Sequence, residues 1–182
     1  MSQAHRSSPA PRPAFAARPA RTELPEFEVM DHAHKAAVAM LQAFKALVAR
    51  LSDQGLDNTA RRSAREILAF FNGPGRSHHA DEETHVFPGL LASSDQELVA
   101  DVKRLQQDHG WLEEDWDELR PHVLAVADGY NGYDLPLLVA ALPVFEALYM
   151  EHIALEEGRV YPAAKRQKLA LLNGRSGEPV AI

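Results

Sequence analysis

Residues 97–119 read ELVADVKRLQQDHGWLEEDWDEL and show the pattern on which the whole chain is built. Apolar residues recur at the three- and four-residue spacing of one face of an α-helix. His109 stands in this stripe where a further leucine is expected. The segment therefore predicts a long helix that packs against other helices and carries a polar residue on its buried face. The apolar stripe consists of Leu98, Val102, Leu105, Leu112, Trp116 and Leu119.

Two segments before this one show the same periodicity. Residues 25–51 begin with a proline, which suits the first turn of a helix, and a short connection around Gly55 follows them. Asp57 is a good capping residue for a second helix. Residues 73–75 read GPG, so we expect this helix to break or kink there and to continue towards residues 87–89, which read FPG.

Capping residues and helix breakers set the remaining boundaries. Ser94 starts a capping box in front of the stripe, and Pro121 is expected to end or bend that helix. Asp134 is expected to cap a fourth helix. Gly158 and Pro162 are expected to close the fourth helix, leaving a short helical tail to about residue 172.

These elements predict an all-α fold. Alternating Val, Ile and Thr patterns typical of strands are absent from the sequence. Four long amphipathic helices with short connections favour an antiparallel up-down four-helix bundle. We expect a flexible basic tail rich in Pro, Ala and Arg over residues 1–22, the bundle over residues 23–172 and a C-terminal tail over residues 173–182.

Composition excludes several classes of function. The chain has 182 residues, 46% of them apolar, which suits one domain with a single core. It contains no cysteine, which excludes disulfides, thiolate zinc sites, cysteine-held iron–sulfur clusters and thiol nucleophiles. The net charge is −7 and the first 22 residues carry four arginines without an acid, so the rest of the chain carries −11. An acidic body argues against nucleic acid as a partner.

Hydropathy leads to an expectation about location. We find no apolar run of about 18 residues and no hydrophobic segment after the basic N-terminus. We therefore expect no membrane partner and a cytoplasmic protein. Gly-rich phosphate loops and nucleophile elbows are also absent from the sequence, which leaves nucleotide chemistry unsupported.

Polar residues interrupt the buried stripe of every predicted helix. Two of the helices carry the spacing His-x-x-x-Glu, which projects both side chains from adjacent turns of one face. Buried carboxylates without a cation are costly, and the sequence shows no obvious inward Lys or Arg beside them. Imidazole and carboxylate suit iron, manganese or zinc. The sequence thus predicts a metal centre with the ligands His34, His78, His79, Glu82, His109, His152 and Glu156.

Donor counting indicates two ions. If Glu82 and Glu156 each bridge both ions, the five imidazoles, the two carboxylates and one oxo or hydroxo bridge leave a single open position on two octahedral ions. A small diatomic ligand could bind there. Two alternatives remain at this stage: Glu113, four residues after His109, could complete one ion, and Glu83 could pair with His79.

The paired motifs resemble those of the hemerythrin-like family, also called the HHE cation-binding domain. Residues 78–83 read HHADEE and are followed by VFP at 86–88, residues 152–157 read HIALEE, and the resemblance covers about residues 26–165. It implies a four-helix bundle around a non-haem di-iron centre that binds dioxygen or related molecules. Oxygen-carrying members place a second His on the third helix, where this chain has Glu113. The chain thus resembles bacterial and regulatory members more than oxygen carriers.

Three functions remain open from the sequence. The protein could bind or sense dioxygen, nitric oxide or peroxide at two iron ions, reduce peroxide or nitric oxide as an enzyme, or be a metal-responsive structural bundle. No catalytic residue and no oligomeric state are assigned. We expect His32, His85 and His122 at the surface, and Trp116 in the packed core. Tyr149 is a candidate for a hydrogen bond to a bound ligand.

Overall fold

The computed structural model describes residues 24–175, and within this range it contains helices and their connections but no strand. The expected all-α class is confirmed. The elements are α1 (Pro25–Gln54), α2 (Asn58–Asn72), α3 (Pro74–His85), α4 (Phe87–Leu91), α5 (Gln96–Asp128), α6 (Leu135–Leu155), the π-helical turn η1 (Glu156–Val160) and α7 (Tyr161–Arg175). The predicted tail at residues 1–22 and most of the tail at 173–182 lie outside the described residues.

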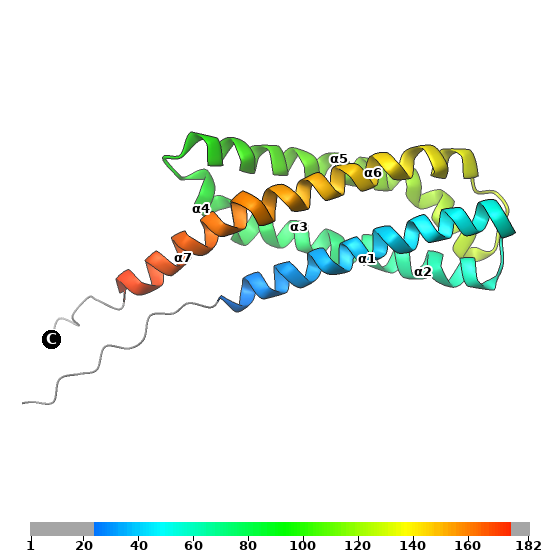
Figure 1. The fold of residues 1–182 in the computed structure, drawn as a ribbon, viewed down its shortest axis with the longest axis horizontal. Helices are drawn as coiled ribbons and strands as arrows, with labels where there is room; N and C mark the ends of the chain where they lie inside the picture. The colour runs from blue at the N-terminus through cyan, green and yellow to red at the C-terminus, as the bar shows by residue number, and fades with distance from the viewer. Residues whose placement is uncertain (1–23, 176–182) are drawn as a thin grey trace, which may run out of the picture.

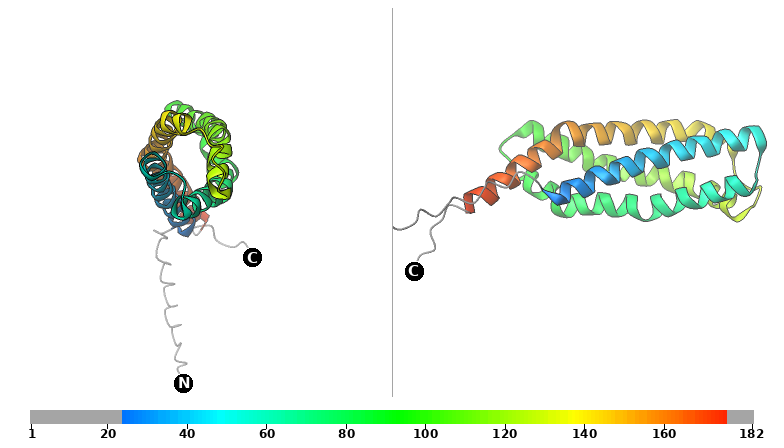
Figure 2. Two further views of the ribbon diagram at one scale, coloured as in Figure 1. Left: turned by 90° about the vertical axis from the view of Figure 1, so that its right-hand side faces the viewer. Right: turned by 60° about the horizontal axis from the view of Figure 1, so that its bottom comes forward.

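The long helices lie side by side around one core (Figure 1). Helix α1 contacts α2 and α6, and α5 contacts the same two helices, so these four form a closed ring. Figure 2 shows this ring end-on in its left view. Helix α3 follows α2 along the bundle and contacts α1, whereas the short α4 contacts α5 and α7 at the end where α1 begins.

Several helix ends follow the sequence signals. The side chain of Asp57 accepts a hydrogen bond from the Ala60 N–H at 2.7 Å and caps α2. Asp134 accepts from the Leu137 N–H at 3.0 Å and caps α6 in the same way. The expected break in the second helix is confirmed, because Gly73 separates α2 from α3. Helix α5 ends at Gly129, whose φ of 86° is readily adopted only by glycine.

One predicted boundary is wrong, and one of the two outcomes expected at Pro121 is excluded. Asp95, rather than Ser94, caps α5, because its carboxylate accepts from the N–H groups of Glu97 and Leu98 at 3.1 Å each. Pro121 does not end α5, which continues to Asp128. A proline removes one backbone hydrogen bond, and the buried side chains of Val123 and Val126 beyond it keep the last turns packed against the bundle.

The regular α-helix is interrupted around Gly158 and a helical tail follows, as predicted, but the interruption is a π-helical turn and not an end. The chain continues through η1 into α7, which reaches Arg175. Val160, Tyr161 and Ala164 are buried after this turn, so packing at the end of the bundle holds the helix together past Gly158 and Pro162. Tertiary contacts here outweigh two local helix-breaking signals.

Two apolar clusters occupy the two ends of the core. The first lies towards the connections at Gly55 and Gly129 and includes Phe44, Ile67 and Leu119. The second joins the start of α1 to α4 and α7 and includes Phe27 and Phe87. The predicted ligand residues of α1, α3 and α5 fall between residues of these two clusters along the chain, and Glu156 does so after α6. Apolar side chains therefore cover the polar layer from both ends.

One continuous helical stretch, Leu135–Gly174, is long and apolar enough to cross a membrane by length and composition. Its most apolar window has a mean hydropathy of 1.5. The search for uninterrupted apolar runs in the sequence did not reveal this window. The core helix of a water-soluble protein passes the same test. Phe145, Tyr149 and His152 of this stretch are buried against the other helices.

Candidate metal centre

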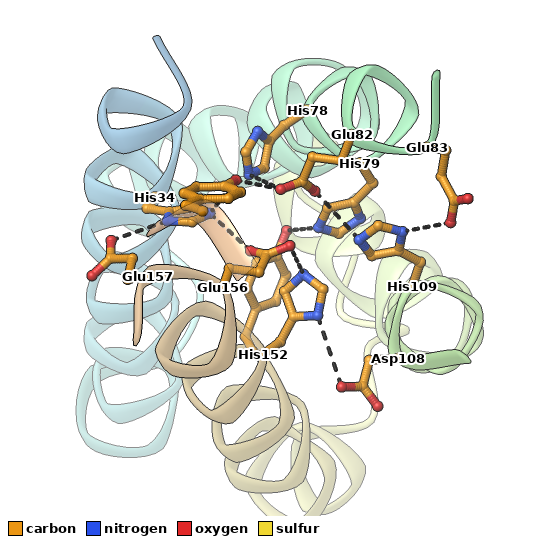
Figure 3. A network of polar contacts seen from close by, with 12 residues as sticks. His34, His78, His79, Glu82, Glu83, Asp108, His109, His152, Glu156 and Glu157 are labelled. Carbon is orange, nitrogen blue, oxygen red and sulfur yellow. Dashed lines mark hydrogen bonds and ion pairs between the residues drawn. The ribbon is translucent and has the colours of Figure 1, made fainter. Parts of the chain in front are cut away.

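All seven predicted ligand residues point into one buried layer in the middle of the bundle (Figure 3). His34 comes from α1, and His109 comes from α5. Helix α3 supplies three of the residues because positions 78, 79 and 82 share one side of the helix. The last two come from the junction of α6 and η1, where the spacing of His152 and Glu156 places both on the inner face.

The ligand atoms form three overlapping groups in which every atom lies within 4.8 Å of the others. One group contains three imidazoles, and a second contains two imidazoles with both carboxylates. Glu82 and Glu156 also join two of the three imidazoles in the third group. The groups are His79, His109 and His152; His34, His78, Glu82 and Glu156; and Glu82, His109, His152 and Glu156. The two carboxylates thus stand between a two-histidine side and a three-histidine side.

Each carboxylate faces one imidazole from either side. Glu82 Oε1 lies 3.7 Å from His78 Nε2, and Glu82 Oε2 lies 3.4 Å from His109 Nε2. Glu156 Oε2 lies 3.0 Å from His34 Nε2, and Glu156 Oε1 lies 3.2 Å from His152 Nε2. Each carboxylate therefore directs one oxygen to each side of the centre, which is the arrangement that a bridging carboxylate requires.

Carboxylates hydrogen-bond to the Nδ1 atoms of two imidazoles, and a third carboxylate faces the Nδ1 atom of another. His34 Nδ1 lies 3.0 Å from Glu157, and His109 Nδ1 lies 3.0 Å from Glu83 (Figure 3). His152 Nδ1 faces Asp108 at 3.9 Å. A partner at Nδ1 fixes the ring and leaves Nε2 free to bind a metal ion.

Neither Glu83 nor Glu113 belongs to these three groups of ligand atoms. Glu83 contacts His109 Nδ1 at 3.0 Å rather than His79, and the rings of His79 and His109 stack. Glu113 does not join the centre: its side chain is 57% exposed and faces Arg76 at 3.6 Å.

Burial and neighbouring charges separate the pKa values of the metal-free centre. Burial, helped by the neighbouring His34, lowers the pKa of His78 to about 4, and burial with His109 lowers that of His79. Burial raises the pKa of Glu82 to about 7. For His152, burial disfavours the charged form, but Asp108 and Glu156 outweigh it and raise the pKa to about 9. His78 and His79 are therefore neutral at pH 7, the form that binds metal.

The buried layer of the described chain holds no lysine or arginine. In residues 24–175 the buried polar and charged residues are five histidines, two glutamates and Asp108, with no lysine or arginine. Six atoms that face the centre have no hydrogen-bond partner within this part of the chain: Nε2 of His78, His109 and His152, Oε2 of Glu82, and both carboxylate oxygens of Glu156. Buried polar atoms rarely stay unpaired.

The separations between these atoms match those expected for ligands around a shared metal ion. With metal–ligand bonds of about 2.1 Å, adjacent ligands at right angles lie about 3 Å apart. The imidazole–carboxylate separations of 3.0 to 3.7 Å are close to this value. Nitrogen and oxygen ligands without sulfur suit iron, manganese or zinc. The residues present therefore fit a centre of metal cations.

Sequence reasoning missed two residues at the centre. Asp108 is buried, and a signal for it existed, because it lies three residues after Leu105 and four before Leu112 on the same helical stripe. Tyr161 is fully buried and donates a hydrogen bond to Glu82 Oε1. No helical periodicity could reveal Tyr161, because the π-helical turn before it shifts its position around the helix.

The remaining histidines lie outside the centre. His32 and His85 are exposed, as expected. His122 is half-buried and accepts the N–H of Asp134 at 3.0 Å, so it supports the start of α6 instead of being merely solvated. Trp116 is buried in the core, as expected. The hydroxyl of Tyr149 lies 3.5 Å from His79 Nε2.

Fold and site together define an all-helical protein with a buried histidine and carboxylate centre for metal cations. The model of the hemerythrin HHE cation-binding domain matches residues 26–164, and the chain belongs to this family. A Haemophilus influenzae protein described as uncharacterized is 29% identical over 108 residues, 59% of this chain. The match spans 60% of the length of that relative. No solved structure matches the chain.

Proposed function

We propose that this protein holds two iron ions in its central layer and binds dioxygen, nitric oxide or peroxide there, in sensing or in handling oxidative or nitrosative stress. We also propose that α1, α2 with α3, α5 and α6 act as the four antiparallel rods of a hemerythrin-type bundle. When bound, the iron pair supplies electrons and coordination positions for a small molecule. The protein is proposed to act in the cytoplasm.

The observation that carries the proposal is the position of the two shared carboxylates. Glu82 and Glu156 each face one imidazole of the two-histidine side and one of the three-histidine side. A single ion would need only one of these sides. Five imidazoles with two bridging carboxylates thus favour two ions over one.

A small cavity on the three-histidine side gives a small molecule room to approach the centre, whereas the open coordination position lies on the two-histidine side. The cavity lies next to His79 and Tyr149, has a volume of about 20 Å³ and is walled by aromatic side chains that include Phe71 and Trp116. About 10 to 15 Å³ is enough for one water-sized molecule. Arg76 lies at this cavity and is held by Glu113 and Asp117.

Metal analysis with an optical spectrum tests the proposal. Protein purified from iron-replete cells should contain about two iron ions per chain, because the centre offers seven ligands. Its ferrous form should change spectrum when nitric oxide is added. Glu156→Gln should lose iron, whereas Glu151→Gln, one turn earlier on α6 and 69% exposed, should keep it. A metal-free or zinc-only protein would contradict the proposal. So would a ferrous protein whose spectrum does not change with dioxygen, nitric oxide or peroxide.

A further inference from the structure

Tyr161 reaches the centre because of the π-helical turn η1. In an uninterrupted α-helix a residue lies about 140° around the axis from the residue five positions before it. In this chain the N–H of Tyr161 bonds to the carbonyl of Glu156, five residues earlier, which is the wider hydrogen-bonding pattern of a π-helix. The extra residue in the turn brings Tyr161 back towards the face that carries Glu156. Such turns are frequent at functional sites.

The phenol oxygen of Tyr161 lies among the ligand atoms of the two-histidine side. It donates a hydrogen bond to Glu82 Oε1 and lies 3.2 Å from His34 Nε2. The ring stacks on the imidazole of His34, with 7° between the planes and 5.3 Å between the centroids. The side chain is 1% exposed, so bulk water does not compete for the hydroxyl.

The two sides of the centre differ in what their own histidines supply. The side of His79 has three imidazoles, whereas the side of His34 has two. Tyr161 stands at the side with fewer imidazoles. Tyr149, the other buried tyrosine near the centre, lies instead at His79, with 3.5 Å between its hydroxyl and His79 Nε2. Tyrosine is an established iron ligand, as in the haem of catalase.

We propose that Tyr161 is itself a ligand of the ion held by His34 and His78, and that an external small molecule binds this ion only in exchange for the phenol oxygen. This inference rests on the proposed function. Coordination replaces the O–H bond of Tyr161 with an oxygen–metal bond and releases one proton to water, as ligand binding to metals generally does. The phenol oxygen then takes the position that the five imidazoles, two bridging carboxylates and one oxygen bridge leave open.

The visible spectrum of the ferric protein tests this assignment. A phenolate bound to ferric iron gives a charge-transfer band, so the iron-loaded wild type should be coloured, and excitation in this band should give Raman lines of a phenolate. Tyr161→Phe should lose the band and keep two irons per chain. Tyr149→Phe removes the other buried hydroxyl and should keep the band. Azide should bleach the band of the wild type and should bind more tightly to Tyr161→Phe.

The outcomes separate this inference from the proposed function. Wild-type protein with two irons but no phenolate band overturns the inference and leaves the function standing. A band that persists in Tyr161→Phe, or vanishes in Tyr149→Phe, also overturns it. If Tyr161→Phe fails to fold, the Raman lines of the wild type still decide whether a phenolate is bound. A chain that takes up no iron at all fails the proposed function, and the inference with it.

Discussion

The apolar end of the bundle and its central layer are built from the same helices, but they differ in whether their buried polar atoms have hydrogen-bond partners. Around Phe44 and Leu119 the core is apolar, and the N–H of Trp116 donates to Asn72 at 2.9 Å. In the central layer, nearly three helical turns away, six atoms that face the centre lack a hydrogen-bond partner in the described part of the chain. One region is complete in itself, whereas the other requires cations.

The largest expected effect is therefore the loss of the metal. When the free ion concentration is a thousand times the Kd, each bound ion adds about 4 kcal/mol to the free energy of unfolding. Removal of two ions should therefore lower this free energy by about 8 kcal/mol. Chelation followed by thermal unfolding measures the change. A Tm that does not depend on chelation would show that the central layer is as self-sufficient as the apolar end.

A cavity at the apolar end should act independently of the metal. Phe44→Ala should lower the free energy of unfolding by about 3–5 kcal/mol, since Phe44 is fully buried. Denaturant unfolding of the iron-loaded and metal-free forms measures the loss in both, and the two values should agree. Iron content should stay at the wild-type level. If Phe44→Ala lost its iron, the two regions would be coupled and the comparison would fail.

The pH dependence of stability should differ between the metal-free and the loaded forms, falling above pH 6.5 only without metal. In the metal-free protein, carboxylates next to His152 raise its folded pKa to about 9, against 6.5 unfolded, so its stabilisation is full below pH 6.5 and lost by about pH 9. The raised pKa of His34 acts in the same direction. The lowered pKa values of His78 and His79 act only below pH 6.5.

Between pH 6.5 and 9 the metal-free protein should lose on the order of 3 kcal/mol of stability, because one pKa unit corresponds to about 1.4 kcal/mol. Metal affinity should increase over the same range, because protons on the ligands compete with the ions. Denaturant unfolding of both forms at the two pH values measures these slopes. Parallel slopes for the metal-free and loaded forms would contradict the assigned ligands.

The support of His152 should have a smaller effect. Asp108→Asn removes the charge that faces Nδ1 of His152 and should weaken metal binding by about 10- to 100-fold. Asp101→Asn is the matched control, because Asp101 lies two turns earlier on α5 and pairs with Arg159 instead. Competition with a chelator of known affinity measures both variants. Equal metal affinities of the two variants would show that Asp108 does not support His152.

The smallest effect is expected at a helix end far from the metal. Asp134→Ala removes the cap of α6 and should cost about 1 kcal/mol in either form. Chemical denaturation measures the loss. Because the cap lies beside the apolar end and away from the ligand residues, a metal-dependent difference here would show that the whole bundle, rather than one layer, responds to the ions.

The same contrast explains what the sequence could predict. Side chains that lie on an α-helical stripe reveal themselves by spacing, which is why His34, His109 and the two His-x-x-x-Glu pairs could be named and why the structure brings them together. Ser94 is wrongly predicted as the cap because local signals do not show which of two adjacent residues caps a helix. They also leave open whether Pro121 ends or bends its helix, because the packing of later turns decides this. Tyr161 could not be found because a π-helical turn changes the period itself.

Diffraction from crystals of the iron-loaded protein, collected on either side of the iron absorption edge, tests the central claim most directly. The account predicts two anomalous peaks per chain, one beside His34 and His78 and one beside His79, His109 and His152, with Glu82 and Glu156 between them. A single peak would contradict the bridging role of these carboxylates. No peak, with imidazoles and carboxylates hydrogen-bonded to one another, would contradict the metal centre altogether.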